Sequence, residues 1–174
     1  APTNVCWGMS NRSVLVRVPL GWTSGEDMCH KTNEIEPLTA RDYSSKQTVE
    51  MRSPDASADI YQLLAGLCVA CRHGFEMENA EAEAERTFAD GDIHDPKNAE
   101  RYASLAQLPD SCAASADCLE RQRKVYEEYD VFSPAMIDGI IKQLRSYNDR
   151  TLRQDIEGNE AMMENLVLQY YHCG

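Results

Sequence analysis

The chain has 174 residues, of which 43% are hydrophobic, and it carries a formal net charge of −12 at pH 7. This length fits one compact domain, and the apolar content is too high for a disordered chain. Because 29 acidic residues face 17 basic ones, with no basic stripe, general binding to nucleic acids or to an anionic membrane surface is excluded. A phosphorylated small molecule is still compatible with this charge, since a few local arginines suffice to bind it.

The start of the sequence and its cysteines bear on where the protein works. No run approaches the ~20 apolar residues of a membrane-spanning helix, and no basic-then-apolar signal peptide opens the chain. The chain begins at Ala1 without a methionine, so we expect a piece of a longer protein. An odd number of irregularly spaced cysteines predicts reduced thiols and a cytoplasmic protein. The seven are Cys6, Cys29, Cys68, Cys71, Cys112, Cys118 and Cys173.

The first 55 residues have the composition of short strands and turns. Residues 13–18 read S-V-L-V-R-V, with valines alternating on one face and Pro19 ending the run, which predicts a strand. Residues 21–45 contain glycine, proline and many polar residues, so we predict a long loop. Residues 47–53 read Q-T-V-E-M-R-S and predict a second strand.

The rest of the chain, 56–174, has helical spacing of its apolar residues. Residues 60–71 are apolar on nearly all sides and predict a helix at the centre of the core. Ser133 and Pro134 give a capping serine followed by proline at the first helical position. We also predict helices at 76–89, 115–129 and 162–170. The expected fold is therefore α+β and mostly helical, with two short strands, a long loop between them and a helical C-terminal region.

Four charged residues are candidates for chemistry. Glu50 and Arg52 are two apart on a predicted strand, so their side chains share a face, about 6 to 7 Å apart. Such a pair is usually a surface ion pair worth ~0 to 1 kcal/mol. The functional alternative is a metal-binding carboxylate beside an arginine that holds an anionic substrate. Arg12 and Arg17 flank the first strand, either as solvated strand ends or as two phosphate contacts.

Together these residues form a pattern that resembles the C-terminal catalytic motifs of the glutamine synthetase family. The pattern is an aromatic residue, then N-R-S and an apolar strand ending R-V-P, and later an apolar residue followed by E-x-R-S-P-D. It is carried here by Trp7, residues 11–19 and residues 48–58. The tail is also similar, from Leu108-Pro109 to the closing Gln169-Tyr170-Tyr171, so the resemblance covers nearly the whole chain. It implies a C-terminal portion, 1–174, of the family's guanido-kinase-like catalytic domain, with the active-site strands in 1–55 and a helical region in 56–174.

The resemblance also implies roles for single residues. Arg12 matches the catalytic arginine that contacts substrate and the transferring phosphoryl group. Arg17 matches an arginine that binds the phosphates of ATP. Glu50 matches a ligand of Mg²⁺ or Mn²⁺, and Arg52 matches the arginine that binds substrate glutamate. The implied reaction joins glutamate and ammonia through a γ-glutamyl phosphate, with ATP consumed, in a homo-oligomer. Metal and arginine around dispersed negative charge suit phosphoryl transfer.

The sequence also departs from the family pattern, and alternatives stay open. The family commonly has basic residues just before the second strand, where this chain has Gln47 and Thr48, with Lys46 as a possible replacement. A ligase for a polyamine or another amine, or a non-catalytic relative with a structural or regulatory role, would share these residues. We expect the chain alone to be inactive, because the family's other metal ligands lie upstream of the matched motifs. We assign Cys68 and Cys71 to core packing rather than zinc binding, and Tyr102 to the core or the surface.

Overall fold

The computed structural model describes residues 2–20, 27–38, 48–55 and 57–171. The chain divides into two compact units, each assembled from two stretches of sequence. The first unit comprises residues 1–53 and 81–107, and the second comprises 54–80 and 108–174. The predicted loop at 21–45 lies partly outside the described residues, and its described part contains the short helix α1 (Met28–Thr32).

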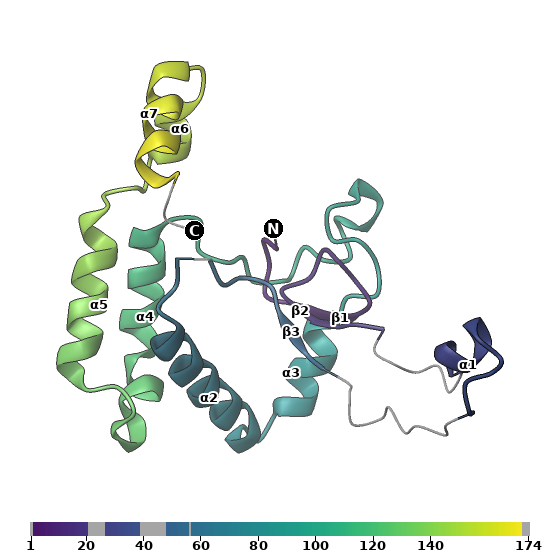
Figure 1. The fold of residues 1–174 in the computed structure, drawn as a ribbon. Helices are drawn as coiled ribbons and strands as arrows, with labels where there is room; N and C mark the ends of the chain where they lie inside the picture. The colour runs from purple at the N-terminus through teal and green to yellow at the C-terminus, as the bar shows by residue number, and fades with distance from the viewer. Residues whose placement is uncertain (1, 21–26, 39–47, 56, 172–174) are drawn as a thin grey trace. The chain divides into compact units, whose positions relative to one another are not determined.

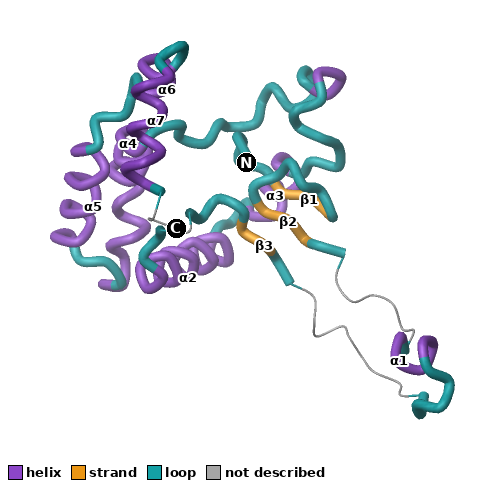
Figure 2. Tube along the Cα trace, turned by 45° about the horizontal axis from the view of Figure 1, so that its top comes forward, coloured by secondary structure: helices purple, strands orange, loops and turns teal. Residues whose placement is uncertain are grey.

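A three-stranded sheet organises the first unit, with strand order β1-β2-β3 (Figure 2). β1 (Trp7–Met9) pairs in parallel with β2 (Val16–Val18), and β2 pairs antiparallel with β3 (Glu50–Met51). The two predicted strands are present but shorter than expected, and β1 is an addition that the sequence did not reveal. Three residues containing a glycine carry too little alternation to be recognised as a strand.

The outer edge of β1 is covered by the returning stretch of the unit. Ala89 N–H donates to the Trp7 carbonyl over 2.8 Å, and the Trp7 and Phe88 rings lie 4.9 Å apart. Gly8 permits this approach, because a Cβ at that position would lie 2.3 Å from the Ala89 carbonyl oxygen. The glycine therefore brings the segment around residue 89 close to the strand that leads into the arginine-bearing loop.

The core of the first unit is small, and both of the unit's stretches of sequence contribute to it. It consists of five buried residues, Cys6, Val14, Ala89, Tyr102 and Leu105. The Tyr102 hydroxyl donates to Asp90 Oδ1 and accepts from Gly91 N–H, each over 3.0 Å. With Arg101 nearby, the Tyr102 hydrogen bond holds the pKa of Asp90 below its usual range. Tyr102 is thus a core tyrosine whose hydroxyl group has hydrogen-bond partners.

α3 (Ala80–Thr87) and the short 3₁₀ helix η2 (Pro96–Asn98) complete the unit, and α3 buries none of its residues.

The second unit is a helical bundle with its own core. α2 (Ile60–Glu76), α4 (Cys112–Glu127) and α5 (Pro134–Ser146) surround that core, and α4 and α5 run side by side (Figure 1). The 3₁₀ helix η3 (Glu128–Asp130) follows α4, and α6 (Leu152–Ile156) and α7 (Glu160–Tyr170) end the chain. The buried residues of this core cluster are Val69, Ala116, Phe132, Ile137 and Ile141. The α+β, mostly helical fold is confirmed, and Ser133 caps α5 as predicted.

One expectation for α2 is wrong. Val69 is the fully buried residue of α2, whereas Cys68 and Cys71 are exposed, so the cysteine pair does not pack in the core. The helix is apolar on almost every side, so its periodicity could not show which stripe faces the bundle. The stripe that does so runs through Ala65, Val69 and Arg72.

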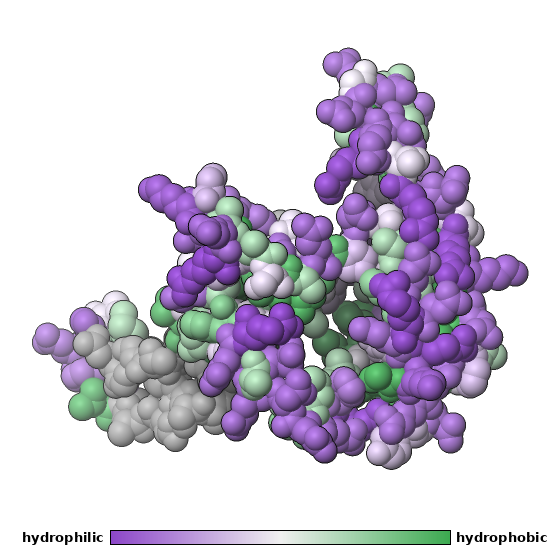
Figure 3. Space-filling view, turned by 180° about the vertical axis from the view of Figure 1, so that it is seen from behind, coloured by the Kyte–Doolittle hydropathy of each residue, from purple (hydrophilic) through white to green (hydrophobic). Residues whose placement is uncertain are grey.

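Ion pairs join the outer faces of α4 and α5 in the helical unit. On the face shown in Figure 3, hydrophilic side chains predominate over the outer helical surface. Arg145 of α5 reaches Asp117 and Glu120 of α4, at 2.9 and 2.5 Å. Within the described ranges, no helix combines the length and apolarity needed to cross a membrane.

Asp149 caps the start of α4 from a distant point in the sequence. Its two carboxylate oxygens accept backbone N–H bonds from Cys112 and Ala113, over 2.7 and 3.1 Å. Partial burial alone would raise the pKa of Asp149, but these hydrogen bonds outweigh it and lower the pKa from its usual value. The ionised form is therefore the one that stabilises the first turn of α4.

We expect Asp149→Ala to lower the free energy of unfolding of the chain by about 1 kcal/mol near pH 7. A carboxylate with a lowered pKa contributes fully above the ordinary aspartate pKa of about 3.9, and its contribution is lost as the pH falls through the lower folded value. Urea unfolding at pH 7 and below pH 4 tests this, and a difference between the two proteins that does not shrink in acid would contradict it.

Candidate functional site

Arg17 and Glu50 form a charged pair across the sheet. They are direct partners in the register of β2 and β3. Nη2 of Arg17 lies 2.5 Å from Glu50 Oε2, and Arg17 Nε donates to the same oxygen over 3.1 Å. The side chains are 22% and 40% exposed, so the pair is only partly solvated. The Cβ atoms of directly opposed residues on antiparallel strands lie about 5 Å apart, so the register of β2 and β3 brings the two charged side chains together.

Arg52 joins this pair to the loop that precedes β2. Its Nε lies 3.4 Å from the second carboxylate oxygen of Glu50, Oε1. Its Nη1 donates to the Arg12 carbonyl and, over 3.3 Å, to the Val14 carbonyl. The guanidinium therefore links the Glu50 carboxylate to the backbone that carries Arg12.

Arg12 itself projects from the loop between β1 and β2. Its side chain is exposed, and in the described part of the chain its guanidinium makes no ion pair. Its two neighbours behave differently, since the side chains of Asn11 and Ser13 are half-buried and hydrogen-bonded to residues 89–93. The loop thus exposes one cation between two anchored residues.

The structure joins the side chains of Arg17, Glu50 and Arg52 in one cluster and attaches Arg12 to it through the Arg12 backbone carbonyl. The expected proximity of Glu50 and Arg52 is confirmed. The Arg17–Glu50 contact could not be foreseen, because it depends on the register of two strands separated by a long loop. The anchoring residues Asn11 and Ser13 were also missed. The only signal that could have found them is their position on either side of Arg12 in the N-R-S motif.

The charges of this cluster differ from those of the chain. The Arg17 and Arg52 guanidiniums share the single carboxylate of Glu50, so these three side chains carry a surplus of positive charge in a protein of net charge −12, and Arg12 is attached through its backbone. Arginine forks suit phosphoryl and carboxylate groups, so the cluster is suited to an anionic ligand. Lys46 and Gln47 lie outside the described residues, so the replacement of the family's basic residues by Lys46 stays a prediction.

Glu50 is chemically suitable as a ligand of a hard divalent cation. Mg²⁺ and Mn²⁺ prefer carboxylate oxygens, and each oxygen of Glu50 can accept more than one partner. Within the described ranges, no group of three or more histidine, cysteine, aspartate or glutamate side chains could hold a metal ion. The chemistry of Glu50 therefore suits a metal ligand, and its role as one stays a prediction.

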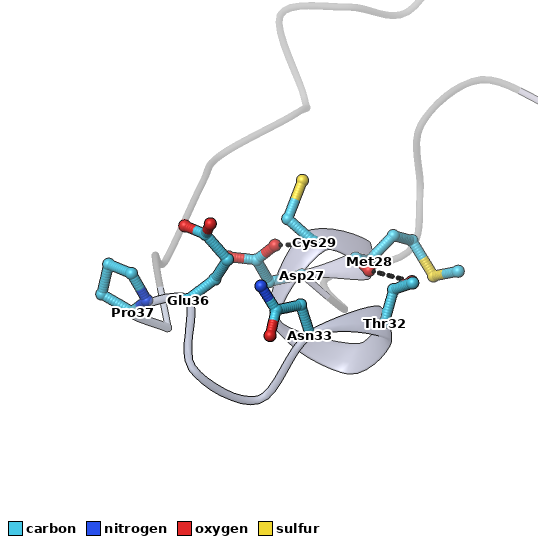
Figure 4. Close-up of a pocket in the computed structure, with 7 residues that line it drawn as sticks. All are labelled: Asp27, Met28, Cys29, Thr32, Asn33, Glu36 and Pro37. Carbon is cyan, nitrogen blue, oxygen red and sulfur yellow. Dashed lines mark hydrogen bonds between the residues drawn. The ribbon is translucent and has the colours of Figure 1, made fainter.

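A separate pocket surrounds the short helix α1 (Figure 4). It is lined by Asp27, Met28, Cys29, Thr32, Asn33, Glu36 and Pro37. Its polar groups are largely engaged locally, since Asp27 Oδ1 accepts from Cys29 N–H over 3.0 Å and Thr32 Oγ1 donates to the Met28 carbonyl over 2.7 Å. None of the four cluster residues lines this pocket, so it is no part of the candidate site.

Comparison with known proteins places the chain in a family. Residues 1–163 match the glutamine synthetase catalytic domain, and the chain belongs to that family. It is 29% identical to a glutamine synthetase of Streptomyces coelicolor over 138 residues, which is 79% of this chain and 24% of the relative. It is 32% identical to one of Mycobacterium bovis over 128 residues, which is 73% of the chain and 24% of the relative. A third, from Thermococcus kodakarensis, is 27% identical over 158 residues, or 90% of the chain and 28% of the relative. The chain thus spans about a quarter of the length of these relatives.

Proposed function

We propose that this chain is the C-terminal portion of the catalytic domain of a glutamate–ammonia ligase. The observation that carries the proposal is the connected cluster of Arg12, Arg17, Glu50 and Arg52, with its surplus of positive charge. Family membership supports the same chemistry, because the matched relatives are glutamine synthetases. In this proposal the strands within 1–55 supply one wall of the active site, and 56–174 form the helical region of the same catalytic domain.

Each charged residue has a distinct part in the proposed reaction. Arg52 binds substrate glutamate, Arg17 binds the phosphates of ATP, and Arg12 contacts the transferring phosphoryl group and the substrate. Glu50 would hold Mg²⁺ or Mn²⁺, which supplies positive charge that offsets the negative charge of the phosphates when bound. The Arg17–Glu50 contact uses Nε and Nη2 of Arg17, and a guanidinium has five N–H donors, so the same side chain can also hold an anionic oxygen.

The wider setting is also part of the proposal. The protein that carries this chain acts in the cytoplasm, as a homo-oligomer, on glutamate, ammonia and ATP. The isolated chain is inactive, because Glu50 is a single metal ligand and the described residues hold no fuller metal-binding group.

The test is an assay of the intact protein that carries this chain. With ATP, Mg²⁺ and labelled glutamate, we expect a γ-glutamyl product with ammonia and much less with a panel of polyamines and monoamines. A product only with another amine would contradict ammonia as the acceptor while keeping the ligase chemistry. No γ-glutamyl product with any amine would overturn the enzymatic proposal and favour a structural or regulatory relative.

A further inference from the structure

The side chain of Asn11 uses its full hydrogen-bonding capacity. Its Nδ2 donates to the carbonyls of Ala89 and Gly91, over 3.0 and 2.8 Å. Its Oδ1 accepts from the backbone N–H of Ser13 over 2.9 Å and from the Ser13 hydroxyl over 2.8 Å. An amide offers two donors and two acceptor sites, and all four are engaged. Four hydrogen bonds on this half-buried side chain fix the Asn11 amide in a single orientation.

The backbone on both sides of Arg12 is held by this arrangement. Ser13 Oγ, oriented by Asn11, accepts from Ile93 N–H over 3.1 Å, which gives the loop a second attachment to residues 89–93. Ser10, on the other side, has a φ of 53°, a left-handed turn that few residues other than glycine adopt. The Arg12 carbonyl accepts from Arg52. The exposed Arg12 side chain is therefore carried on a backbone that is fixed at several points.

We propose that Asn11 is the positioning residue of Arg12: it holds the 10–13 loop against residues 89–93 so that the Arg12 guanidinium is presented in one place. The inference rests on the proposed function in assigning Arg12 to the phosphoryl group. A displacement of about 1 Å in a group that contacts the reacting atoms can cost about 100-fold in rate, so fixing the loop has a direct catalytic consequence.

The chain offers variants that separate positioning from simple stabilisation. Asn11→Asp keeps the acceptor for Ser13 but places a carboxylate oxygen against two carbonyls, whereas Asn11→Ala removes every contact. Asn98→Ala is the matched control, because Asn98 Nδ2 donates to the Asp92 carbonyl over 2.9 Å. It therefore anchors the same 89–93 segment without contacting the loop. Ser13→Ala is a milder variant, because it removes the hydroxyl that accepts from Ile93 and donates to Asn11 but keeps both contacts of Asn11 with residues 89 and 91.

The first measurement needs only the chain. Tryptic cleavage after Arg12 reports local opening of the loop, and we expect it to accelerate on the order of tenfold or more in both Asn11 variants, because each loses at least the two hydrogen bonds to the Ala89 and Gly91 carbonyls. We expect a smaller acceleration in Ser13→Ala and a change within about twofold in Asn98→Ala. If an Asn11 variant fails to fold by circular dichroism, Ser13→Ala against Asn98→Ala decides the same question. Equal cleavage rates in those two variants would overturn the proposal.

The second measurement is a double-mutant cycle in the intact protein. We expect Asn11→Ala to lower kcat about 100-fold with little change in KM for glutamate, and to lower it hardly further when Arg12→Ala is already present. If the two substitutions lower kcat independently, so that their fold-losses multiply in the double variant, Asn11 only stabilises the fold. An equal loss of kcat in Asn98→Ala would lead to the same conclusion. If the wild type makes no γ-glutamyl product, the proposed function fails, and the tryptic measurement still decides whether Asn11 fixes the loop.

Discussion

Glu50→Gln is expected to lower kcat/KM of the intact protein by about 100-fold or more, because a charge contribution of several kcal/mol is lost and each ~1.4 kcal/mol is tenfold in rate. The amide has nearly the same size but no net charge. It would leave Arg17 and Arg52 without their shared carboxylate and would bind a divalent cation poorly. The loss should be accompanied by a much higher Mg²⁺ or Mn²⁺ concentration for half-maximal activity.

The control for this substitution is Glu81→Gln, an exposed glutamate on α3 outside the cluster. It should change neither activity nor metal dependence. The stability of Glu50→Gln should fall by no more than about 1 kcal/mol, since the ion pairs are partly solvated. A Glu50→Gln protein with wild-type activity at limiting metal would remove Glu50 from the metal site.

Arg12→Ala is expected to lower kcat by about 1,000-fold, the low end of the loss seen when an arginine that stabilises a transferring phosphoryl group is removed. The exposed Arg12 side chain makes no ion pair in the described part of the chain, so the free energy of unfolding should stay within about 0.5 kcal/mol of the wild type. The substitution therefore lowers activity without lowering stability, whereas substitution of a core residue lowers both. Arg12→Lys should recover only part of the rate, because an ammonium lacks the two-pronged geometry.

Arg153→Ala serves as the matched control for Arg12, because Arg153 is an exposed arginine on α6 and lies in the other compact unit. We expect its steady-state kinetics to equal those of the wild type. If Arg12→Ala retains more than half of wild-type kcat, Arg12 makes no contact that matters in the reaction, and the inference about Asn11 loses its catalytic meaning.

Local sequence signals accounted for most of the helices. Ser133 and Pro134 start α5 because capping and the fixed φ of proline act within one turn. The α2 pattern gave the helix but not its orientation, because a helix that is apolar all round has no unique stripe and only its neighbours decide that Val69 is buried. The cap that Asp149 gives to α4 has no local signal, because Asp149 lies 37 positions after Cys112 and 36 positions after Ala113.

The sequence indicated which residues are candidates for the site, but it could not predict the contacts between them. The order and spacing of Arg12, Arg17, Glu50 and Arg52 identified the four members through their resemblance to a family. The contact of Arg17 with Glu50 depends on strand register, and the contacts of Asn11 span about 80 residues. Such long-range pairings are decided by packing of the whole unit, including the close approach that Gly8 allows.

The central claim is that this cluster serves phosphoryl transfer from ATP to the side-chain carboxylate of glutamate. Its most direct test is positional isotope exchange in the intact protein, with ATP carrying ¹⁸O in the β–γ bridge, Mg²⁺ and no amine. Reversible transfer breaks the bond between the γ-phosphorus and the bridging oxygen, forms one to the glutamate carboxylate, and lets the β-phosphate rotate before the phosphoryl group returns. We predict glutamate-dependent movement of ¹⁸O into the non-bridging β positions in the wild type and none above background in Glu50→Gln. No glutamate-dependent exchange in the wild type, or equal exchange in both proteins, would contradict the claim.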